Sequence, residues 1–161
     1  MAGDVKTSEV MALAKKHLGN IPRSNSSRGA RPQEPVQLAE RRIIFKDARV
    51  RQADWRRSYL APTRSSGHKE YAIPLMLFSD LLGGGTTSWL YQSLVVEKKM
   101  AINVSTHYSP NGLDQGIFLL FATPAPGIDL ETLEKAIEDE LSLVMEKGFT
   151  AAALELSLIT I

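Results

Sequence analysis

Histidine is the residue most often used for zinc binding and for acid–base chemistry, and this sequence has three: His17, His68 and His107. Two zinc ligands on one turn of a helix need a spacing of three or four residues. No histidine stands at such a spacing from another histidine, or from a glutamate that would complete a pair. Cysteine is absent, which excludes disulfides and thiolate ligands. We therefore expect no metal ligand and no catalytic residue in this chain.

Each histidine has a simpler interpretation than ligation. His17 falls at the end of an expected helix, where a cation is mildly favoured. His68 precedes another expected helix and fits a solvated turn. His107 alternates with core residues in an expected strand, on the same face as Asn103 and Ser105. A polar open face or a subunit contact suits His107 better than a ligand role.

The run Gly83-Gly84-Gly85 could in principle cradle a phosphate group. A phosphate loop lies between a strand and a helix and ends in a lysine. These glycines instead follow an expected helix, and the next residues, 86–89, read Thr-Thr-Ser-Trp without a lysine. We therefore expect a corner between two helices, in which glycine supplies a positive φ and lets the helices approach closely. Nucleotide binding is not expected.

Basic residues gather in one stretch that also contains Trp55 and Tyr59, namely Arg41, Arg42, Arg49, Arg51, Arg56 and Arg57. Acidic residues intersperse this stretch, and Arg56 and Arg57 would point to opposite faces of a strand. The chain as a whole has a net charge of only +1. A solvated sheet face is favoured over a nucleic-acid site. No apolar run approaches the ~20 residues that span a membrane, so no membrane partner is expected.

Hydrophobic periodicity and turn signals predict both helices and strands. The expected helices cover residues 8–18 with Thr7 as N-cap, 69–82, 88–98 with a cap at Thr86 or Thr87, 129–147 with Asp129 as N-cap and Gly148 as end, and a further helix from Thr150. The expected strands cover residues 41–45, 50–60, 102–108 and 116–122. This order predicts an α+β fold, with a largely antiparallel sheet and helices packed on one of its faces.

Three residue patterns assign faces within these elements. Residues that share one face of the second strand are Ala53, Trp55, Arg57, Tyr59 and Ala61. The inward set of the third strand is Ile102, Val104, Thr106 and Tyr108, and the turn at 109–112 joins it to the fourth strand as a hairpin. The apolar stripe of the helix at 129–147 is Leu130, Leu133, Ile137, Leu141 and Val144.

Composition along the chain suggests three regions. Residues 1–21 have the pattern of the tail end of a preceding α+β unit, and residues 22–39 are a linker rich in Pro, Arg and Ser. Residues 40–161 form the main α+β unit, truncated at its C-terminus, because the sequence stops inside an apolar, helix-like stretch. We interpret the chain as a fragment whose uncovered apolar faces favour self-association.

Six local patterns occur in an order that resembles a known family. They are Ala2-Gly3-Asp4-Val5; the helix end His17-Leu18-Gly19-Asn20-Ile21-Pro22; Glu40-Arg41-Arg42; Tyr59-Leu60-Ala61-Pro62; the run from Leu82 through Gly83-Gly84-Gly85 to Tyr91; and Pro124-Ala125-Pro126-Gly127. Together they resemble the C-terminal, noncatalytic half of a subunit of the insulinase/pitrilysin family of zinc metallopeptidases, which includes mitochondrial-processing-peptidase-like proteins. The resemblance covers nearly the whole chain.

This resemblance implies where the chemistry lies. In such families zinc is held by a His-x-x-Glu-His helix and a later Glu in the first half of the subunit, and no stretch here reads His-x-x-Glu-His. The resemblance implies no cofactor in this chain and zinc in the missing N-terminal half. The glycine-rich corner takes part in substrate recognition in processing-peptidase partners, so Gly83, Gly84 and Gly85 are the implied substrate-binding residues. Trp89 stands where the family usually has Arg, which weakens a charge-based role for this corner.

The expected function is therefore that of a noncatalytic fragment of a zinc-dependent endopeptidase, with a scaffold role and a part in the wall of a chamber for unfolded peptides. Its expected partners are the missing N-terminal half or a second peptidase-like subunit, and an unfolded peptide. One alternative is a metal-less paralogue with a structural or assembly role, and a weaker one is a free-standing ferredoxin-like binding module. The Tyr-Leu-Ala-Pro and triple-glycine motifs resemble bacterial members of the family, and bacterial members are often periplasmic.

Overall fold

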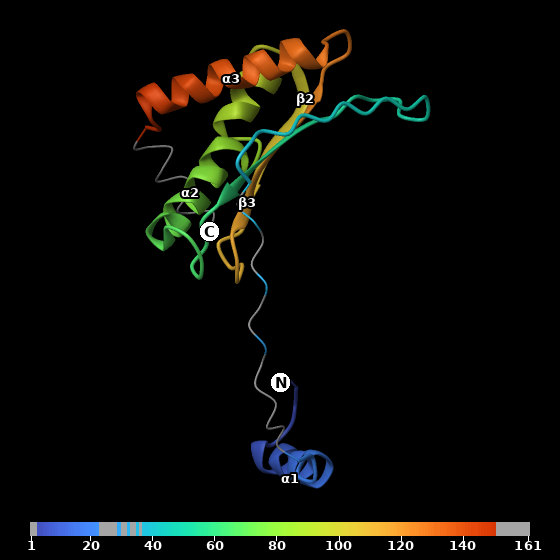
Figure 1. The fold of residues 1–161 in the computed structure, drawn as a ribbon, viewed down its shortest axis with the longest axis vertical. Coiled ribbons are helices and arrows are strands. Elements are labelled where there is room, and N and C mark those ends of the chain that lie inside the picture. Colours follow the sequence, from blue (N-terminus) through green and yellow to red (C-terminus); the bar gives the residue numbers. More distant parts are fainter. Residues whose placement is uncertain (1–2, 23–28, 30–31, 33–34, 36, 151–161) are drawn as a thin grey trace. The chain divides into compact units, whose positions relative to one another are not determined.

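The computed structural model describes residues 3–22, 29, 32, 35 and 37–150, and the chain divides into two units, Met1–Leu38 and Ala39–Ile161. The first unit contains helix α1, Thr7–Leu18, none of whose residues is buried (Figure 1). Lys6 is its N-cap and Thr7 is its first helical residue, so the predicted cap at Thr7 is wrong by one position. No helix in the described part of the chain is both long and apolar enough to cross a membrane.

A three-stranded antiparallel sheet is the framework of the second unit (Figure 1). Its strands are β1, Trp55–Ala61; β2, Ala101–Tyr108; and β3, Gly116–Pro124. β3 is central and pairs with both neighbours, so that Trp55 and Val104 both stand opposite Ala122. This arrangement confirms the predicted α+β class and the predicted hairpin of β2 and β3.

The helices of this unit pack on one face of the sheet. A short 3-10 helix, η1, Lys69–Tyr71, leads into α2, Ala72–Gly83, and α3 covers Leu130–Lys147. As predicted, Asp129 caps α3 through a 2.7 Å hydrogen bond from the Thr132 backbone N–H, and Gly148 follows its end. Helices and sheet share one hydrophobic core, whose buried residues include Leu82, Leu90, Leu94, Val104, Leu120, Leu133, Ile137 and Val144.

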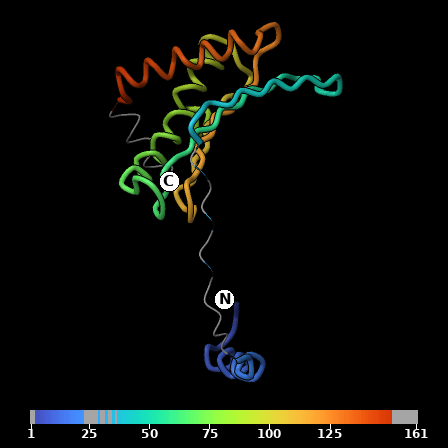
Figure 2. Tube along the Cα trace, viewed as in Figure 1, coloured from blue at the N-terminus to red at the C-terminus, as the bar shows by residue number. Residues whose placement is uncertain are grey.

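The strand predicted at residues 41–45 is absent, and β1 begins only at Trp55. Instead, the chain projects away from the sheet, turns where the Val50 N–H donates to the Asp47 carbonyl at 3.0 Å, and returns to β1. Figure 2 shows this projection, which we call the arm, residues 39–54. β-branched residues favour a strand only where a neighbouring strand completes the hydrogen bonds, and the described residues supply no such neighbour here.

Two further differences concern regularity. The helix predicted at 88–98 is largely a π-helix, η2, Tyr91–Glu97, continued by bonds such as Lys98 N–H to the Ser93 carbonyl at 2.9 Å. The register of β2 shifts between Ala101 and Asn103, and this bulge leaves Ile102 48% exposed instead of in the core. Leu130, predicted in the α3 stripe, is also partly exposed at the helix start. The helix predicted from Thr150 lies outside the described residues.

Candidate functional site

The glycine corner joins α2 to the start of the π-helical segment. Gly83 is the last residue of α2 and is buried, whereas Gly84 and Gly85 are exposed. A Cβ on Gly83 would lie 2.6 Å from the Thr106 backbone nitrogen and 2.8 Å from its Cγ2. The close approach is therefore between α2 and strand β2, not between two helices as predicted.

The positive φ predicted for these glycines is wrong. Gly84 has φ −76°, and the glycines with positive φ in the described residues are Gly3, Gly67, Gly127 and Gly148. The turn is closed instead by Ser88, whose hydroxyl donates to the Gly85 carbonyl at 2.6 Å. Of the three glycines assigned to substrate binding, the structure thus leaves Gly84 and Gly85 accessible and commits Gly83 to packing.

Next to this corner, a carboxylate lies inside the protein. Glu140 of α3 is only 4% exposed and accepts three hydrogen bonds of 2.6 Å, from Trp89 Nε1, Ser93 Oγ and Lys98 Nζ. Burial raises the pKa of Glu140, but these three donors outweigh it and hold the pKa below its ordinary value of 4.5. The ionised side chain thus ties α3 to both ends of η2.

The sequence contains a signal for this buried carboxylate, although it forms no catalytic or metal-binding motif. Glu140 stands three residues after Ile137 and four before Val144, inside the apolar stripe that begins at Leu133. A charge at such a position is buried only when donors surround it. Trp89 is one of those donors, so its side chain serves the internal structure of this corner.

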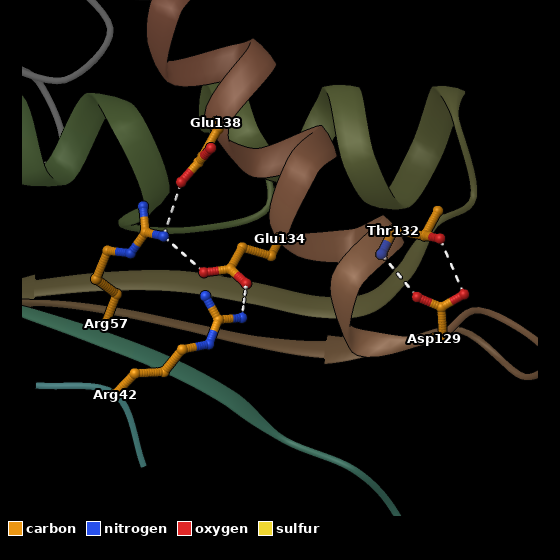
Figure 3. Close-up of polar contacts among 6 residues, drawn as sticks. All are labelled: Arg42, Arg57, Asp129, Thr132, Glu134 and Glu138. Carbon is orange, nitrogen blue, oxygen red and sulfur yellow. Dashed lines mark hydrogen bonds and ion pairs between the residues drawn. The ribbon is translucent and has the colours of Figure 1, made fainter. Parts of the chain in front are cut away.

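A second carboxylate of α3 binds two arginines of the basic stretch (Figure 3). Glu134 pairs with Arg42 of the arm and, at 2.6 Å, with Arg57 of β1, and Arg57 also reaches Glu138 at 2.8 Å. Burial works against ionisation of Glu134, yet the two guanidinium groups lower its pKa overall. Arg57 points to the helix face, whereas Arg56 lies over the Phe121 ring on the other face, as predicted.

The face of the sheet that points away from the helical core also carries apolar side chains. Alternation along the register places Leu60, Ile117, Leu119 and Phe121 on this face, which we call the open face. Leu60 and Ile117 are cross-strand partners and are 48% and 56% exposed. Along β2, Asn103, Ser105 and His107 also lie on the open face, and His107 stands opposite Leu119. The open face therefore carries both apolar and polar side chains.

The described residues do not form a zinc site. They contain no group of three His, Asp or Glu side chains close enough to hold a metal ion. His17 lies in the last turn of α1, His68 sits 82% exposed beside Glu70 with 3.2 Å between Nδ1 and Oε1, and His107 is on β2.

Comparisons with known proteins found several that this chain is similar to. The family described as peptidase M16 inactive domain matches residues 1–159. A relative named zinc protease PqqE, from Helicobacter pylori, is 29% identical over 157 residues, which are 96% of this chain and 34% of that protein. A solved protease from Helicobacter pylori is 30% identical with a TM-score of 0.82, and covers 98% of this chain and 38% of its own.

Two more distant structures share the fold. A conserved protein from Enterococcus faecalis V583 has a TM-score of 0.68 at 18% identity, covering 96% of this chain and 35% of its own. A peptidase M16 inactive domain from Pseudomonas fluorescens has a TM-score of 0.54 at 19% identity, covering 65% and 24%. The chain thus spans about a third of the length of the zinc protease that it resembles.

Proposed function

Because this chain belongs to the peptidase M16 inactive-domain family, we propose that it is a noncatalytic unit that binds unfolded peptides beside a zinc-dependent peptidase site. In this proposal, zinc and its activated water belong to polypeptide outside this chain, in an N-terminal half or in a second peptidase-like subunit. The residues of this chain contribute the scaffold and part of the wall that the peptide contacts.

The observation that carries this proposal is the open face of the sheet. An extended peptide presents alternate side chains to one side. Leu60 and Ile117, which stand opposite each other on β1 and β3, offer exposed apolar surface to such side chains. Both β1 and β2 are edge strands of the sheet order, so either could add main-chain hydrogen bonds to a bound strand. The exposed backbone of Gly84 and Gly85 is a second proposed contact for peptide.

Binding can be measured by fluorescence anisotropy with a labelled, unstructured peptide that has alternating apolar residues. Replacing Ile117 by Ser should weaken binding about fivefold to tenfold, because it removes roughly 1 kcal/mol of apolar contact. The matched control is Leu113→Ser, because Leu113 is 70% exposed in the β2–β3 loop and belongs to none of the strands that form the open face. Equal effects of both variants, or no binding by the parent chain, would overturn the proposal.

The alternative, a structural or assembly subunit without a peptide ligand, is favoured by one observation. The indole of Trp89 beside the glycine corner donates inward to Glu140, so this position supports the fold instead of presenting a charge to a substrate. The anisotropy experiment separates the two functions. A subunit of this second kind would keep its fold and its partner while showing no affinity for the labelled peptide.

A further inference from the structure

Three side chains between Trp89 and Lys98 converge on one carboxylate of α3. Trp89 Nε1 donates to Oε2 of Glu140, whereas Ser93 Oγ and Lys98 Nζ both donate to its Oε1, each at 2.6 Å. These donors occupy positions 89, 93 and 98, so the two that share Oε1 are five residues apart. A single buried oxygen therefore fixes how far Ser93 and Lys98 can lie from each other.

The sharing of Oε1 fits the π-helical form of η2. The Lys98 N–H donates to the Ser93 carbonyl at 2.9 Å, so a backbone bond of the π-helix joins the same two residues whose side chains meet on Glu140. In an α-helix, residues five apart lie about 140° from each other around the axis. The two side chains would then leave the helix on different sides, so a shared carboxylate oxygen favours the π-helical form.

A strained residue follows this segment. Lys99 has φ 53°, in the left-handed region that a residue with a Cβ rarely adopts. The turn that contains it is closed by the Met100 N–H, which donates to the Leu94 carbonyl at 2.8 Å. Such strain persists only where surrounding contacts impose it. We therefore expect the shape of this segment to depend on its contacts, three of which Glu140 supplies.

Two side chains connect this segment to the glycine corner. Trp89 directly follows Ser88, whose N–H and hydroxyl donate to the Gly85 carbonyl at 3.1 Å and 2.6 Å. From within η2, Gln92 Nε2 donates to the Thr86 carbonyl at 2.6 Å. A change in the helical form of η2 would rotate Gln92 relative to the corner and strain these bonds. The shape of the corner is therefore linked to the form of η2.

We propose that Glu140 is a positioning residue, which keeps η2 in its π-helical form and thereby holds the glycine corner in the shape that contacts peptide. This inference rests on the proposed function, because it concerns the second of the two peptide contacts proposed there. Glu140 itself does not touch peptide, since it is only 4% exposed. It acts through Trp89 and Ser93 on the backbone of Gly84 and Gly85.

Amide hydrogen exchange measured by NMR tests the first step without any peptide. Glu140→Gln has nearly the same size but no charge, so the backbone amides of Ser88 and Lys98 should exchange roughly tenfold faster. Glu134→Gln is the matched control, because it neutralises a carboxylate of α3 that pairs with the arm and β1 instead of η2. Unchanged exchange at both amides in Glu140→Gln, or an equal increase in the control, would overturn the inference.

A second variant keeps the test valid if Glu140→Gln does not fold. Lys98→Met removes only the ammonium group that shares Oε1, and the Lys98 side chain is 44% exposed, so this variant should fold. It should show the same faster exchange at Ser88, to a smaller extent. Exchange at Ser88 that is unchanged in Lys98→Met would contradict a link between the shared oxygen and the corner.

Peptide affinity tests the second step, at a temperature at which circular dichroism shows every variant to be folded. Glu140→Gln should weaken binding of the labelled peptide about threefold to tenfold, and Glu134→Gln should leave it unchanged. A purely structural role would lower the melting temperature of Glu140→Gln without changing the affinity of the folded protein. That result would overturn the inference.

The variant Ile117→Ser separates this inference from the proposed function. If the parent chain binds peptide and Ile117→Ser weakens binding while Glu140→Gln does not, the positioning role fails and the open face remains a peptide site. If the parent chain binds no peptide, the proposed function fails, and the positioning role for peptide fails with it.

Discussion

Helix α3 carries two carboxylates six residues apart that meet different surroundings. Glu140 is buried, with neutral donors from Trp89 and Ser93 and one ammonium group from Lys98. Glu134 lies nearer the surface and is held by guanidinium groups from the arm and from β1. Both have a lowered pKa, but only Glu140 would leave desolvated donors behind if it were removed.

The Glu140 cluster maintains the fold, whereas the Glu134 cluster orients the arm. The Glu140 cluster joins α3 to η2 and thereby positions the glycine corner. The Glu134 cluster joins α3 to the base of the arm. We infer that losing the first carboxylate weakens the whole unit, whereas losing the second frees the arm and leaves the unit folded.

The largest expected effect is that of Glu140→Ala. Removing the carboxylate leaves the Trp89 N–H and the Ser93 hydroxyl without an acceptor, so the free energy of unfolding should fall by roughly 2–4 kcal/mol. Urea denaturation followed by circular dichroism measures this change. Asp139→Ala is the control, because Asp139 is next to Glu140 in the sequence but is exposed. If the two variants lose the same small amount, the buried cluster does not maintain the fold.

The contrast between buried and exposed positions extends to the glycine run. Gly83→Ala should destabilise the unit by about 1–3 kcal/mol, because its Cβ would overlap the Thr106 backbone. Gly85→Ala should have little effect on stability, since nothing lies within 4 Å of its Cβ. Urea denaturation of these variants, combined with peptide anisotropy, decides whether Gly85 has a binding role. A peptide affinity that is unchanged in the Gly85 variant would remove this residue from the proposed site.

Acid should affect the Glu140 cluster in a definite direction. The folded-state pKa of Glu140 is lowered, so its stabilisation is complete above the ordinary value of 4.5 and is lost as pH falls through the lower folded-state value. As the pH falls below 4.5 and through the lower folded-state pKa, the parent chain should therefore lose more stability than Glu140→Gln, which cannot titrate there. Parallel curves for the two proteins would contradict an ionised Glu140 in the folded state.

A small stability effect is also expected for Glu134→Gln. A partly exposed ion pair contributes below about 1 kcal/mol, so the melting curve should shift only slightly. Hydrogen exchange and limited proteolysis should nevertheless increase within residues 43–50, because Arg42 loses its charged partner. An unchanged arm in this variant would mean that Asp54 and Thr123 are sufficient to hold the base.

Much of the fold could be predicted from the sequence, because periodicity and capping act locally. Asp129 and Gly148 delimit α3, and alternation along β2 and β3 identified the hairpin. The sequence predicts a strand at residues 41–45 because these residues have β propensity, but propensity does not reveal whether a partner strand exists. The sequence predicts an ordinary helix at η2, because hydrophobic periodicity does not distinguish the i→i+5 bonds of a π-helix from the i→i+4 bonds of an α-helix.

The candidate site was predicted less completely. The family resemblance pointed to the glycine corner, but which glycine packs and which is exposed depends on how closely α2 approaches Thr106. The open face follows from alternation only after the register of β1 and β3 is known. The pairing of Arg42 and Arg57 with one glutamate links residues far apart in sequence, and no local pattern records it.

Our proposal is that this chain contributes to peptide binding and does not itself cleave peptides. Elemental analysis of the purified chain for zinc tests this claim most directly, together with cleavage of an unstructured fluorogenic peptide in the presence and absence of a chelator. We predict no stoichiometric zinc and no chelator-sensitive cleavage. Stoichiometric zinc with cleavage that a chelator abolishes would contradict the claim and would place a metal site within this chain.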